Sequence, residues 1–339
     1  MLTFSSIVGH RRVTTLLAQA IARDTLPPTL LLAGAAGVGK YEVARAAAAA
    51  LNCLAPRRDV APLALDACGE CRSCQRIERN VHVDVITLEP DDRASIKIDV
   101  VREVLERTGF RPFEGRRRVV LIRDADTLEA AAQNALLKSL EEPPPATVFL
   151  LTTAVPGKLL PTVRSRCMRL RFGQLTEREV AEVLVARHGI DARAAQSAAA
   201  LADGRVGTAM TLNATDVAVL RELALLLLRQ AGSNAPLASR LQAAATVAVP
   251  GKNKERPREE VALVLRFLAS MLRDLELLNT TGGSAALANP VVADDLQSLA
   301  RRFTGDRARH AFVATDRALA ALERNAGVKV VADWLSVQL

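Results

Sequence analysis

A glycine-rich segment between a predicted strand and a predicted helix constrains the fold of this chain more than any other feature. Residues 34–41 read GAAGVGKY and nearly match the phosphate-loop pattern G-x-x-x-x-G-K-[ST]. The apolar run 29–33 predicts a buried strand before the loop, and the alanine-rich stretch 41–51 predicts a helix after it. In this setting backbone N–H groups surround phosphate oxygens, and the lysine reaches the outer phosphates. The alternative is a glycine-rich turn without a ligand. The predicted nucleotide-binding positions are Gly34, Gly37, Gly39 and Lys40.

The last position of the loop departs from the pattern. Tyr41, the only tyrosine of the chain, stands where Ser or Thr would place its hydroxyl on Mg²⁺. A phenol oxygen lies too far from its own backbone to take that place. The sequence therefore leaves ATP binding open and argues against a well-held Mg²⁺.

A second departure follows the predicted strand 118–123. This strand resembles the one that carries the Mg²⁺-linked aspartate of P-loop NTPases, and Asp124 fits that aspartate. In oligomeric ATPases of this class the next residue is a water-polarising glutamate. Here it is Ala125, whose methyl group cannot position water, and Asp126 should point elsewhere. We therefore predict that this chain lacks effective ATPase activity.

The first half of the chain alternates strand-like and helix-like stretches. Strands separated by helices predict an α/β fold with a parallel sheet. The predicted strands are 29–33, 83–87, 118–123, 147–152 and 168–172, and the predicted helices are 41–51, 99–107 and 128–140.

The β signal disappears after residue 172. Helices are predicted over 176–187 and 191–202, and Thr176 with Glu179 forms a capping box for the first of them. From residue 216 onward nearly everything reads as helix. The expected breaks are near 231–234, 249–257, 280–284 and 305. This pattern predicts an α/β domain over 1–172, a helical lid over 173–212 and a helical domain over 213–339.

Four of the five cysteines predict a metal site. Cys53, Cys68, Cys71 and Cys74 have the spacing C-x14-C-x2-C-x2-C. Four thiolates complete a tetrahedral zinc site and leave no open position for catalysis. An iron–sulfur cluster is the main alternative, but its cysteine run would place another cysteine where Glu78 stands. Four free thiols are the remaining alternative. We predict structural zinc.

Composition excludes several classes of protein. The 339 residues are 50% hydrophobic and 24% charged, which is globular rather than disordered. The net charge of +8 is a mild excess and permits an acidic partner such as nucleic acid. No secretory signal is visible, and apolar runs such as 29–38 are shorter than the roughly 20 residues that span a bilayer. We expect a cytoplasmic protein with reduced thiols and no membrane partner.

Two further segments carry a family resemblance. Residues 134–144 read NALLKSLEEPP, and residues 159–167 read LLPTVRSRC. Together with the cysteine insert, they resemble the AAA+ ATPase domain of bacterial clamp-loader subunits, over about the first 210 residues. The resemblance implies a subunit of the DNA polymerase III holoenzyme. Its partners would be the motor subunits (gamma/tau) and the delta subunit in a ring of five, with the sliding clamp and primer–template DNA reached through the complex.

The resemblance also assigns a role to Arg166. In this family the arginine of the Ser-Arg-Cys motif reaches into a neighbour's ATP site, and Arg166 is that residue here. A guanidinium offers a planar fork of donors to phosphate charge, and such a finger accelerates hydrolysis by about 10³–10⁵. The alternative is a solvated basic edge, which is the interpretation we prefer for Arg164, Arg169 and Arg171.

Two more positions are compared with the family through the resemblance. Thr152 ends the fourth predicted strand, where the family places a polar nucleotide sensor, although a plain strand-end threonine is an equal alternative. Alignment of residues 203–209 puts the family's second sensing arginine at Gly207. This third departure also argues against ATP turnover.

The leading hypothesis is a clamp-loader stator without effective ATPase activity. The alternatives are an active motor subunit (gamma/tau-like), a zinc-dependent DNA-binding module and a general scaffold.

Overall fold

The computed structural model describes residues 2–91, 94–210, 214–233, 235–249, 256–281, 287–324 and 326–339, which divide into two compact units over 1–210 and 211–339. The first unit contains the elements η1 (Phe4–Ser6), α1 (Arg11–Ala22), β1 (Thr29–Ala33), α2 (Lys40–Asn52), β2 (Arg57–Val60), β3 (Leu63–Asp66), α3 (Arg72–Glu78), β4 (Val85–Leu88), α4 (Ile98–Thr108), β5 (Arg118–Ile122), η2 (Ala125–Thr127), α5 (Ala130–Glu141), β6 (Thr147–Thr153), η3 (Pro156–Lys158), α6 (Pro161–Arg166), β7 (Met168–Arg171), α7 (Glu177–His188), α8 (Ala192–Leu201) and α9 (Val206–Met210).

Every described secondary-structure element of the second unit is a helix. It contains α10 (Ala214–Gly232), α11 (Leu237–Ala248), α12 (Arg258–Thr281), η4 (Pro290–Val292), α13 (Ala293–Ala300), α14 (Asp306–Glu323) and α15 (Val328–Gln338).

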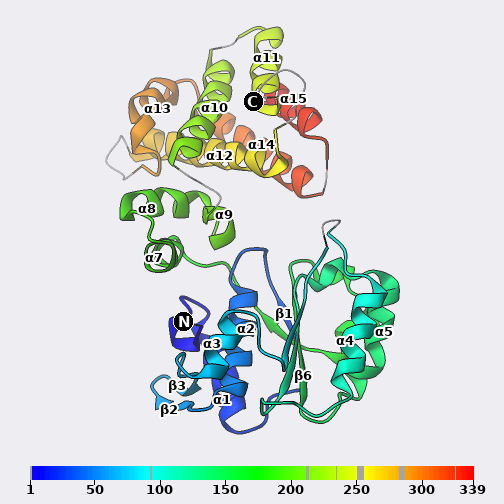
Figure 1. The fold of residues 1–339 in the computed structure, drawn as a ribbon. Coiled ribbons are helices and arrows are strands. Elements are labelled where there is room, and N and C mark those ends of the chain that lie inside the picture. Colours follow the sequence, from blue (N-terminus) through cyan, green and yellow to red (C-terminus); the bar gives the residue numbers. More distant parts are fainter. Residues whose placement is uncertain are drawn as a thin grey trace. The chain divides into compact units, whose positions relative to one another are not determined.

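A five-stranded parallel sheet forms the centre of the first unit, in the order β4-β5-β6-β1-β7 (Figure 1). Successive strand residues point to opposite faces. Leu30 and Leu32 therefore pack with α1 and α2 on one face, while Leu31 packs with α4, α5 and α6 on the other. Burial on both faces explains why β1 reads as a continuous apolar run. The predicted α/β fold is confirmed in its parallel sheet, its strand–loop–helix motif and its helical C-terminal region.

The α2 helix links two regions that matter for function. It begins at Lys40, directly after the glycine-rich loop, and Cys53 is its C-cap residue. The antiparallel β2–β3 hairpin and α3 follow, so the cysteine insert is built onto the far end of α2. The sequence pattern predicted neither this hairpin nor α1.

The strand predicted over 83–87 begins two residues later in the structure. Asp84, just before it, is fully buried and its side chain bonds to residues outside the strand. Its carboxylate accepts hydrogen bonds from the backbone N–H groups of Phe113, Glu114 and Gly115, each at 2.8 Å. It also lies 2.9 Å from Nη2 of Arg118. Burial by itself would raise the pKa of Asp84, but these N–H groups and the guanidinium together lower it. Asp84 therefore ties β4 to the segment that enters β5.

Three helices follow the sheet and complete the first unit. Thr176 accepts a hydrogen bond from the N–H of Glu179, whose carboxylate accepts one from the Thr176 N–H, so the predicted capping box is confirmed. Helices α7 and α8 cover the predicted ranges closely, while α9 was not predicted. Arg187 of α7 donates to the backbone and hydroxyl oxygens of Ser6, which ties this helical segment to the N-terminal residues.

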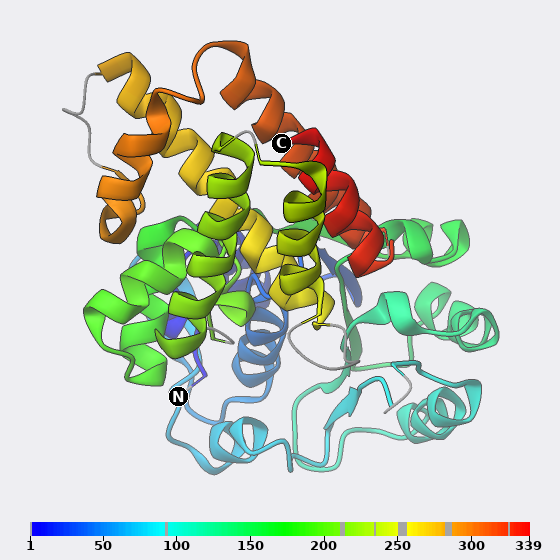
Figure 2. The same ribbon diagram turned by 90° about the horizontal axis from the view of Figure 1, so that it is seen from above.

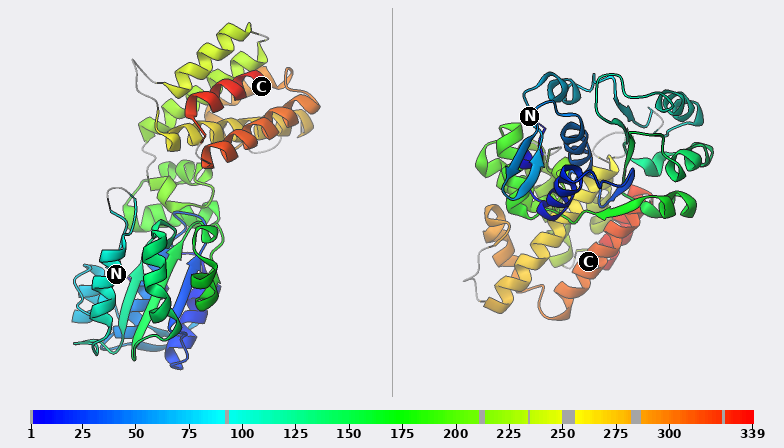
Figure 3. Two further views of the ribbon diagram at one scale, coloured as in Figure 1. Left: turned by 90° about the vertical axis from the view of Figure 1, so that its right-hand side faces the viewer. Right: turned by 90° about the horizontal axis from the view of Figure 1, so that it is seen from below.

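Helix α12 forms the core of the second unit (Figure 2). Many of its side chains are buried, and they recur every three or four residues, which gives the helix a broad buried face. Those at most 1% exposed are Val261, Val264, Leu265, Phe267, Leu268, Met271, Leu272, Asp274 and Leu275. Helix α12 packs against α10 and α14, and Figure 3 shows α12 and α14 side by side.

Helix breaks in the second unit match the sequence expectations where the structure describes them. The break at Gly305 separates α13 from α14, and α10, α11 and α12 end near the other three predicted breaks. Residues 234, 250–255 and 282–286 of those breaks, and the predicted domain boundary at 212–213, lie outside the described residues. No helix in the described parts of the chain is both long and apolar enough to cross a bilayer.

Candidate nucleotide pocket and metal centre

The glycine-rich loop curls around the side chain of its own lysine. Lys40 Nζ donates to the backbone oxygens of Gly34 at 2.9 Å and Ala35 at 2.7 Å. Burial lowers the pKa of Lys40, while the negative charges of Asp124, Asp126 and Glu42 act in the opposite direction. The ammonium group is therefore held within the loop, where a phosphate oxygen could replace a carbonyl as its partner.

A pocket of about 580 Å³ opens beside this loop, a volume in the range of small-molecule and cofactor sites. Residues of the loop, of the C-terminal ends of β5 and β6, and of α7 and α9 line it. Its apolar walls include Leu2, Ile7, Val8, Leu175, Val183, Val206 and Met210. Its charged lining consists of Lys40, Glu42, Arg45, Arg123, Asp124 and Arg187, together with His10 and His188. A lining that combines apolar and cationic side chains suits a ligand with a planar base and phosphate groups.

The structure places Tyr41 away from the role of a magnesium ligand. Its phenol oxygen donates to Oε1 of Glu89 at 3.4 Å. The guanidinium carbons of Arg45 and Arg123 lie 5.8 and 5.2 Å from the centre of its ring, which is cation–π distance. Burial raises the pKa of Tyr41, so the phenol stays protonated. The ring is a packing surface for two arginines.

The other predicted positions of the pocket converge at the ends of β5 and β6. The Asp124 N–H donates to Oγ1 of Thr152 at 3.1 Å, and both residues line the pocket. Asp126 points elsewhere, as predicted, and accepts hydrogen bonds from the Thr153 hydroxyl at 2.7 Å and the Ala154 N–H at 3.0 Å. Ala125 is fully buried in the apolar core. No carboxylate therefore occupies the position from which a water-polarising glutamate would act.

The helical segment after the sheet contacts the loop through two glycines. The Gly207 N–H donates to the backbone oxygen of Gly37 at 3.2 Å. Gly37 has a φ of +75°, and a Cβ on it would lie only 3.2 Å from the Gly207 nitrogen. A Cβ on Gly207 would lie 3.3 Å from the Gly37 Cα. The position aligned with a sensing arginine is thus a close backbone contact.

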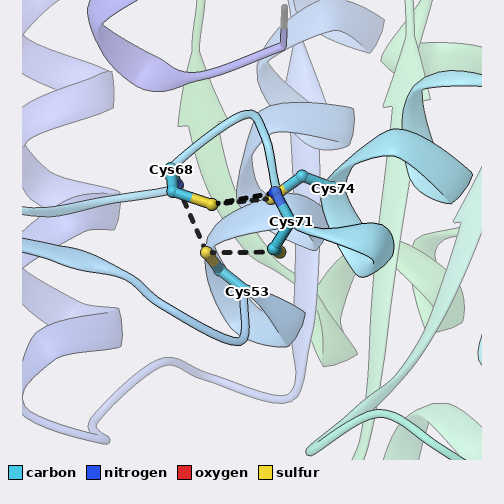
Figure 4. Close-up of side chains that lie close together, drawn as sticks. All are labelled: Cys53, Cys68, Cys71 and Cys74. Atoms are coloured by element: carbon cyan, nitrogen blue, oxygen red, sulfur yellow. Dashed lines mark hydrogen bonds between the residues drawn. The ribbon is translucent and has the colours of Figure 1, made fainter.

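The four predicted cysteine ligands form one compact cluster (Figure 4). Their Sγ atoms all lie within 4.8 Å of one another, and the Cys53–Cys71 and Cys68–Cys74 sulfur pairs are 4.0 Å apart. A tetrahedral ion with Zn–S bonds of about 2.3 Å requires sulfur separations of about 3.8 Å. The donor set and the spacing therefore fit a single ion, and the cage is too small to enclose several iron and sulfide atoms.

Backbone groups orient these sulfurs and tune the thiols. The Cys68 N–H donates to Sγ of Cys53 at 3.2 Å, and the Cys71 N–H donates to Sγ of Cys68 at 3.3 Å. Burial acts to raise the pKa of Cys71, but hydrogen bonds from Cys74, Leu54 and the neighbouring thiols lower it to about 6. Burial raises the pKa values of Cys53 and Cys74. A bound cation would favour the deprotonated form of all four cysteines.

Two arginines connect this cluster to the rest of the fold. Arg116 Nη2 donates to the backbone oxygen of Cys53 at 2.7 Å. Arg45 of α2 donates to the backbone oxygens of Ile77 at 3.1 Å and Glu78 at 2.7 Å, at the end of α3. Since Arg45 also lines the pocket, one side chain of α2 contacts both the cysteine insert and the nucleotide pocket.

Arg166 lies at the end of α6, and it does not occur among the described residues that line the pocket. Its Nε and Nη2 atoms lie 3.0 and 2.7 Å from Oε2 of Glu141, and Nη1 donates to the Thr162 backbone oxygen at 3.1 Å. Its side chain is 30% exposed. Arg166 is therefore an ordered surface arginine held by one carboxylate.

The structure thus brings the predicted residues together in two groups and leaves Arg166 apart from both. In the first group, Gly34 accepts a hydrogen bond from Lys40 within the loop, and the pocket lining includes Gly37, Gly39, Lys40, Tyr41, Asp124 and Thr152. The four cysteines form the second group. Sequence reasoning missed His10, whose Nε2 donates to the Val38 backbone oxygen at 2.7 Å, and the pocket arginines Arg45 and Arg123. None of these residues belongs to a recognisable motif, although Arg123 precedes Asp124 directly.

Comparisons with known proteins match the chain to one family. The family model described as "DNA polymerase III, delta subunit" matches residues 9–176, about half of the chain. The delta' subunit of DNA polymerase III from Pseudomonas aeruginosa is 42% identical over 140 residues, which cover 41% of this chain and 41% of the relative. The tau/gamma subunit of Haemophilus influenzae is 36% identical over 182 residues, which cover 54% of this chain and 25% of the relative.

Solved structures also align with the chain. A DNA polymerase III gamma subunit-related protein from Thermotoga maritima aligns over 91% of this chain and 99% of its own, at 17% identity and a TM-score of 0.35. A RuvB variant from the same organism covers 87% and 84% at 17% identity, with a TM-score of 0.42. The chain spans between a quarter and about half of the lengths of the curated relatives it matches. From its family match and these relatives, the chain belongs to the family of bacterial DNA polymerase III clamp-loader subunits.

Proposed function

We propose that this chain is the delta' subunit of a DNA polymerase III clamp loader, a stator that helps to load the sliding clamp without hydrolysing ATP. The observation that carries the proposal is the loss of hydrolytic groups from an otherwise intact pocket. Tyr41 packs against two arginines, and the buried methyl group of Ala125 replaces a catalytic carboxylate. The pocket and loop remain, so a nucleotide held by Gly34, Gly37, Gly39, Lys40, Asp124 and Thr152 would be a structural ligand.

In this proposal Arg166 acts in trans on the ATP site of a neighbouring motor subunit. Its position on the surface, apart from its own pocket, supports a role at a subunit contact. A guanidinium can form two parallel hydrogen bonds to phosphoryl oxygens and stabilise the charge that develops during transfer. The salt bridge to Glu141 would have to open or be shared for this contact to form.

The remaining parts of the chain receive structural roles. The cysteine cluster would hold zinc, which would fix the insert onto the end of α2 and supply no chemistry to a reaction. Residues 1–172 would form the ATPase-type domain, 173–212 the lid, and 213–339 the collar that joins neighbours in the five-membered ring. The partners would be gamma/tau and delta, with the clamp and primer–template DNA reached through the assembled complex.

Reconstitution of the full complex with the motor and delta subunits tests this proposal. Arg166→Ala should abolish hydrolysis at the one site that it serves, by about 10³-fold or more, and should lower DNA-stimulated ATPase and clamp loading of the whole complex. Glu141→Gln is the matched control, because it breaks the same salt bridge and keeps the guanidinium. Unchanged ATPase and loading with Arg166→Ala would show that the finger assignment is wrong.

Similarity to tau/gamma relatives favours one second candidate, an active motor subunit. The isolated full-length chain distinguishes the two candidates. A motor subunit would hydrolyse ATP in the presence of Mg²⁺, whereas the proposed stator gives no turnover above background.

A further inference from the structure

Arg123 lies in the pocket lining between two carboxylates and an aromatic ring. It directly follows β5, and its Nε lies 3.6 Å from Oδ2 of Asp124. Its Nη1 lies 3.8 Å from Oε1 of Glu89, while its guanidinium faces the ring of Tyr41. Two carboxylates and an aromatic face therefore surround the half-exposed guanidinium in the pocket lining, directly beside the residue that matches a magnesium-linked aspartate.

These neighbours make a poor site for Mg²⁺. The ion requires oxygen ligands in near-octahedral geometry at about 2.0–2.1 Å. The side chain at position 41 directs its oxygen to Glu89 instead of offering a short hydroxyl near the loop. A divalent cation next to Asp124 would also be repelled by the guanidinium that already lies against this carboxylate. The residues present thus do not fit the metal that usually accompanies a phosphate loop.

The same residues suit phosphate without a metal. Four cationic side chains line the pocket, Lys40, Arg45, Arg123 and Arg187, against the two carboxylates of Glu42 and Asp124. Guanidinium groups bind phosphate oxygens with paired, charge-assisted hydrogen bonds. The α2 N-terminus adds backbone N–H groups and positive potential at the loop. The pocket therefore supplies from side chains the positive charge that Mg²⁺ would otherwise provide.

We propose that this pocket binds a nucleoside di- or triphosphate without a divalent cation, and that the Arg123 guanidinium takes the place beside Asp124 that Mg²⁺ would take. Arg123 contacts the phosphate oxygens of the ligand, and apolar side chains of the lining receive the base. The inference rests on the nucleotide-holding role proposed above for the loop and is independent of Arg166. It gives this site a ligand-binding role in place of a catalytic one.

Isothermal titration of the full-length chain with ADP and with ATP tests the inference, once in EDTA and once in excess Mg²⁺. The expected Kd values differ by less than about threefold between the two buffers, a difference of under 1 kcal/mol. Arg123→Gln should weaken binding by about tenfold or more in both buffers, because a charge-assisted hydrogen bond is lost. Arg169→Gln, on the exposed edge strand β7, is the matched control and should leave Kd unchanged. Thermal melting establishes that each variant is folded.

The outcomes distinguish the metal-free site and the role of Arg123 from nucleotide binding itself. Binding that is tenfold or more tighter with Mg²⁺ than with EDTA would overturn the metal-free site alone. Equal binding by wild type and a folded Arg123→Gln variant would overturn the role of Arg123. Absence of nucleotide binding in both buffers would overturn this inference together with the nucleotide-holding role, and the ATPase test of Arg166 would be unaffected.

Discussion

The two ends of α2 carry two sites, one of which lacks groups that its chemistry would need while the other has a complete set of donors. At its start, the glycine-rich loop and the pocket have kept their shape but lack a short hydroxyl at position 41 and a carboxylate at position 125. At its end, the cysteine cluster has kept a complete set of four donors at distances that suit one ion. The difference teaches that shape and chemistry are separable, because the packing around the pocket does not depend on the hydroxyl and the carboxylate that hydrolysis would need.

The comparison also indicates what each site does for the fold. Structural zinc sites use four protein ligands and contribute folding energy, so we expect the cluster to lose its proposed function when one sulfur is removed. A pocket that holds a nucleotide needs only complementary charge and volume, which several residues share. We therefore expect changes at the cluster to act on stability and changes at the pocket to act on ligand binding.

Removal of the metal should give the largest effect on stability. A removal that left stability unchanged would contradict the structural role assigned to the cluster. Elemental analysis should find about one zinc per chain, and Cys74→Ser should remove it and lower the free energy of unfolding by about 4 kcal/mol or more. Cys167→Ser is the control, because Cys167 lies in the apolar core outside the cluster and burial raises its pKa to about 11. Visible absorbance with bound iron, or a metal-free and fully stable wild type, would contradict the zinc assignment.

A second prediction concerns Asp84, which supports the sheet edge near the insert. Asp84→Asn leaves Arg118 as a buried charge without its partner, so we expect a loss of about 3 kcal/mol in the free energy of unfolding, measured by urea titration. ADP binding by the folded variant should change little, because Asp84 is not among the described residues that line the pocket. A loss of nucleotide binding with unchanged stability would reverse the proposed division between the two regions.

The pH dependence of the same variant sharpens this prediction. Because folding lowers the pKa of Asp84, its stabilising contribution is fully present above the unfolded value of about 4 and is lost as the pH falls toward and through the folded value. The stability difference between wild type and Asp84→Asn should therefore be constant near neutrality and shrink below about pH 4. A difference that stays constant into that acid range would contradict the cause assigned to the shift.

The smallest predicted effect separates two glycines of the loop. Both have positive φ, +75° at Gly37 and +94° at Gly39, but only Gly37 has a backbone neighbour within contact distance of an added Cβ. Gly37→Ala should therefore cost about 2 kcal/mol, from strain together with displacement of Gly207, against about 1 kcal/mol for Gly39→Ala. Thermal unfolding of the two variants measures the difference. Equal costs would mean that the contact between α9 and the loop contributes nothing to stability.

The sequence was most informative where spacing along the chain determines geometry. The strand–loop–helix motif, the capping box at Thr176 and the cysteine spacing each depend on residues close in sequence, and the structure has all three. The β2–β3 hairpin carries a short, mostly exposed and charged strand, so its pattern gave no period-two signal. The later start of β4 could not be predicted, because Asp84 meets its partners about 30 residues further along the chain.

By itself, the sequence determined the parallel α/β class, the four cysteine donors and the absence of two catalytic groups, since these follow from residue identity and local order. Only the tertiary structure decided that Arg123 lies against Asp124 and Tyr41, that Gly207 contacts Gly37, and that Glu141 holds Arg166. Except for Arg123 with Asp124, these contacts join residues on different elements. Their distances are set by how helices pack on the sheet, which no local pattern of side chains specifies.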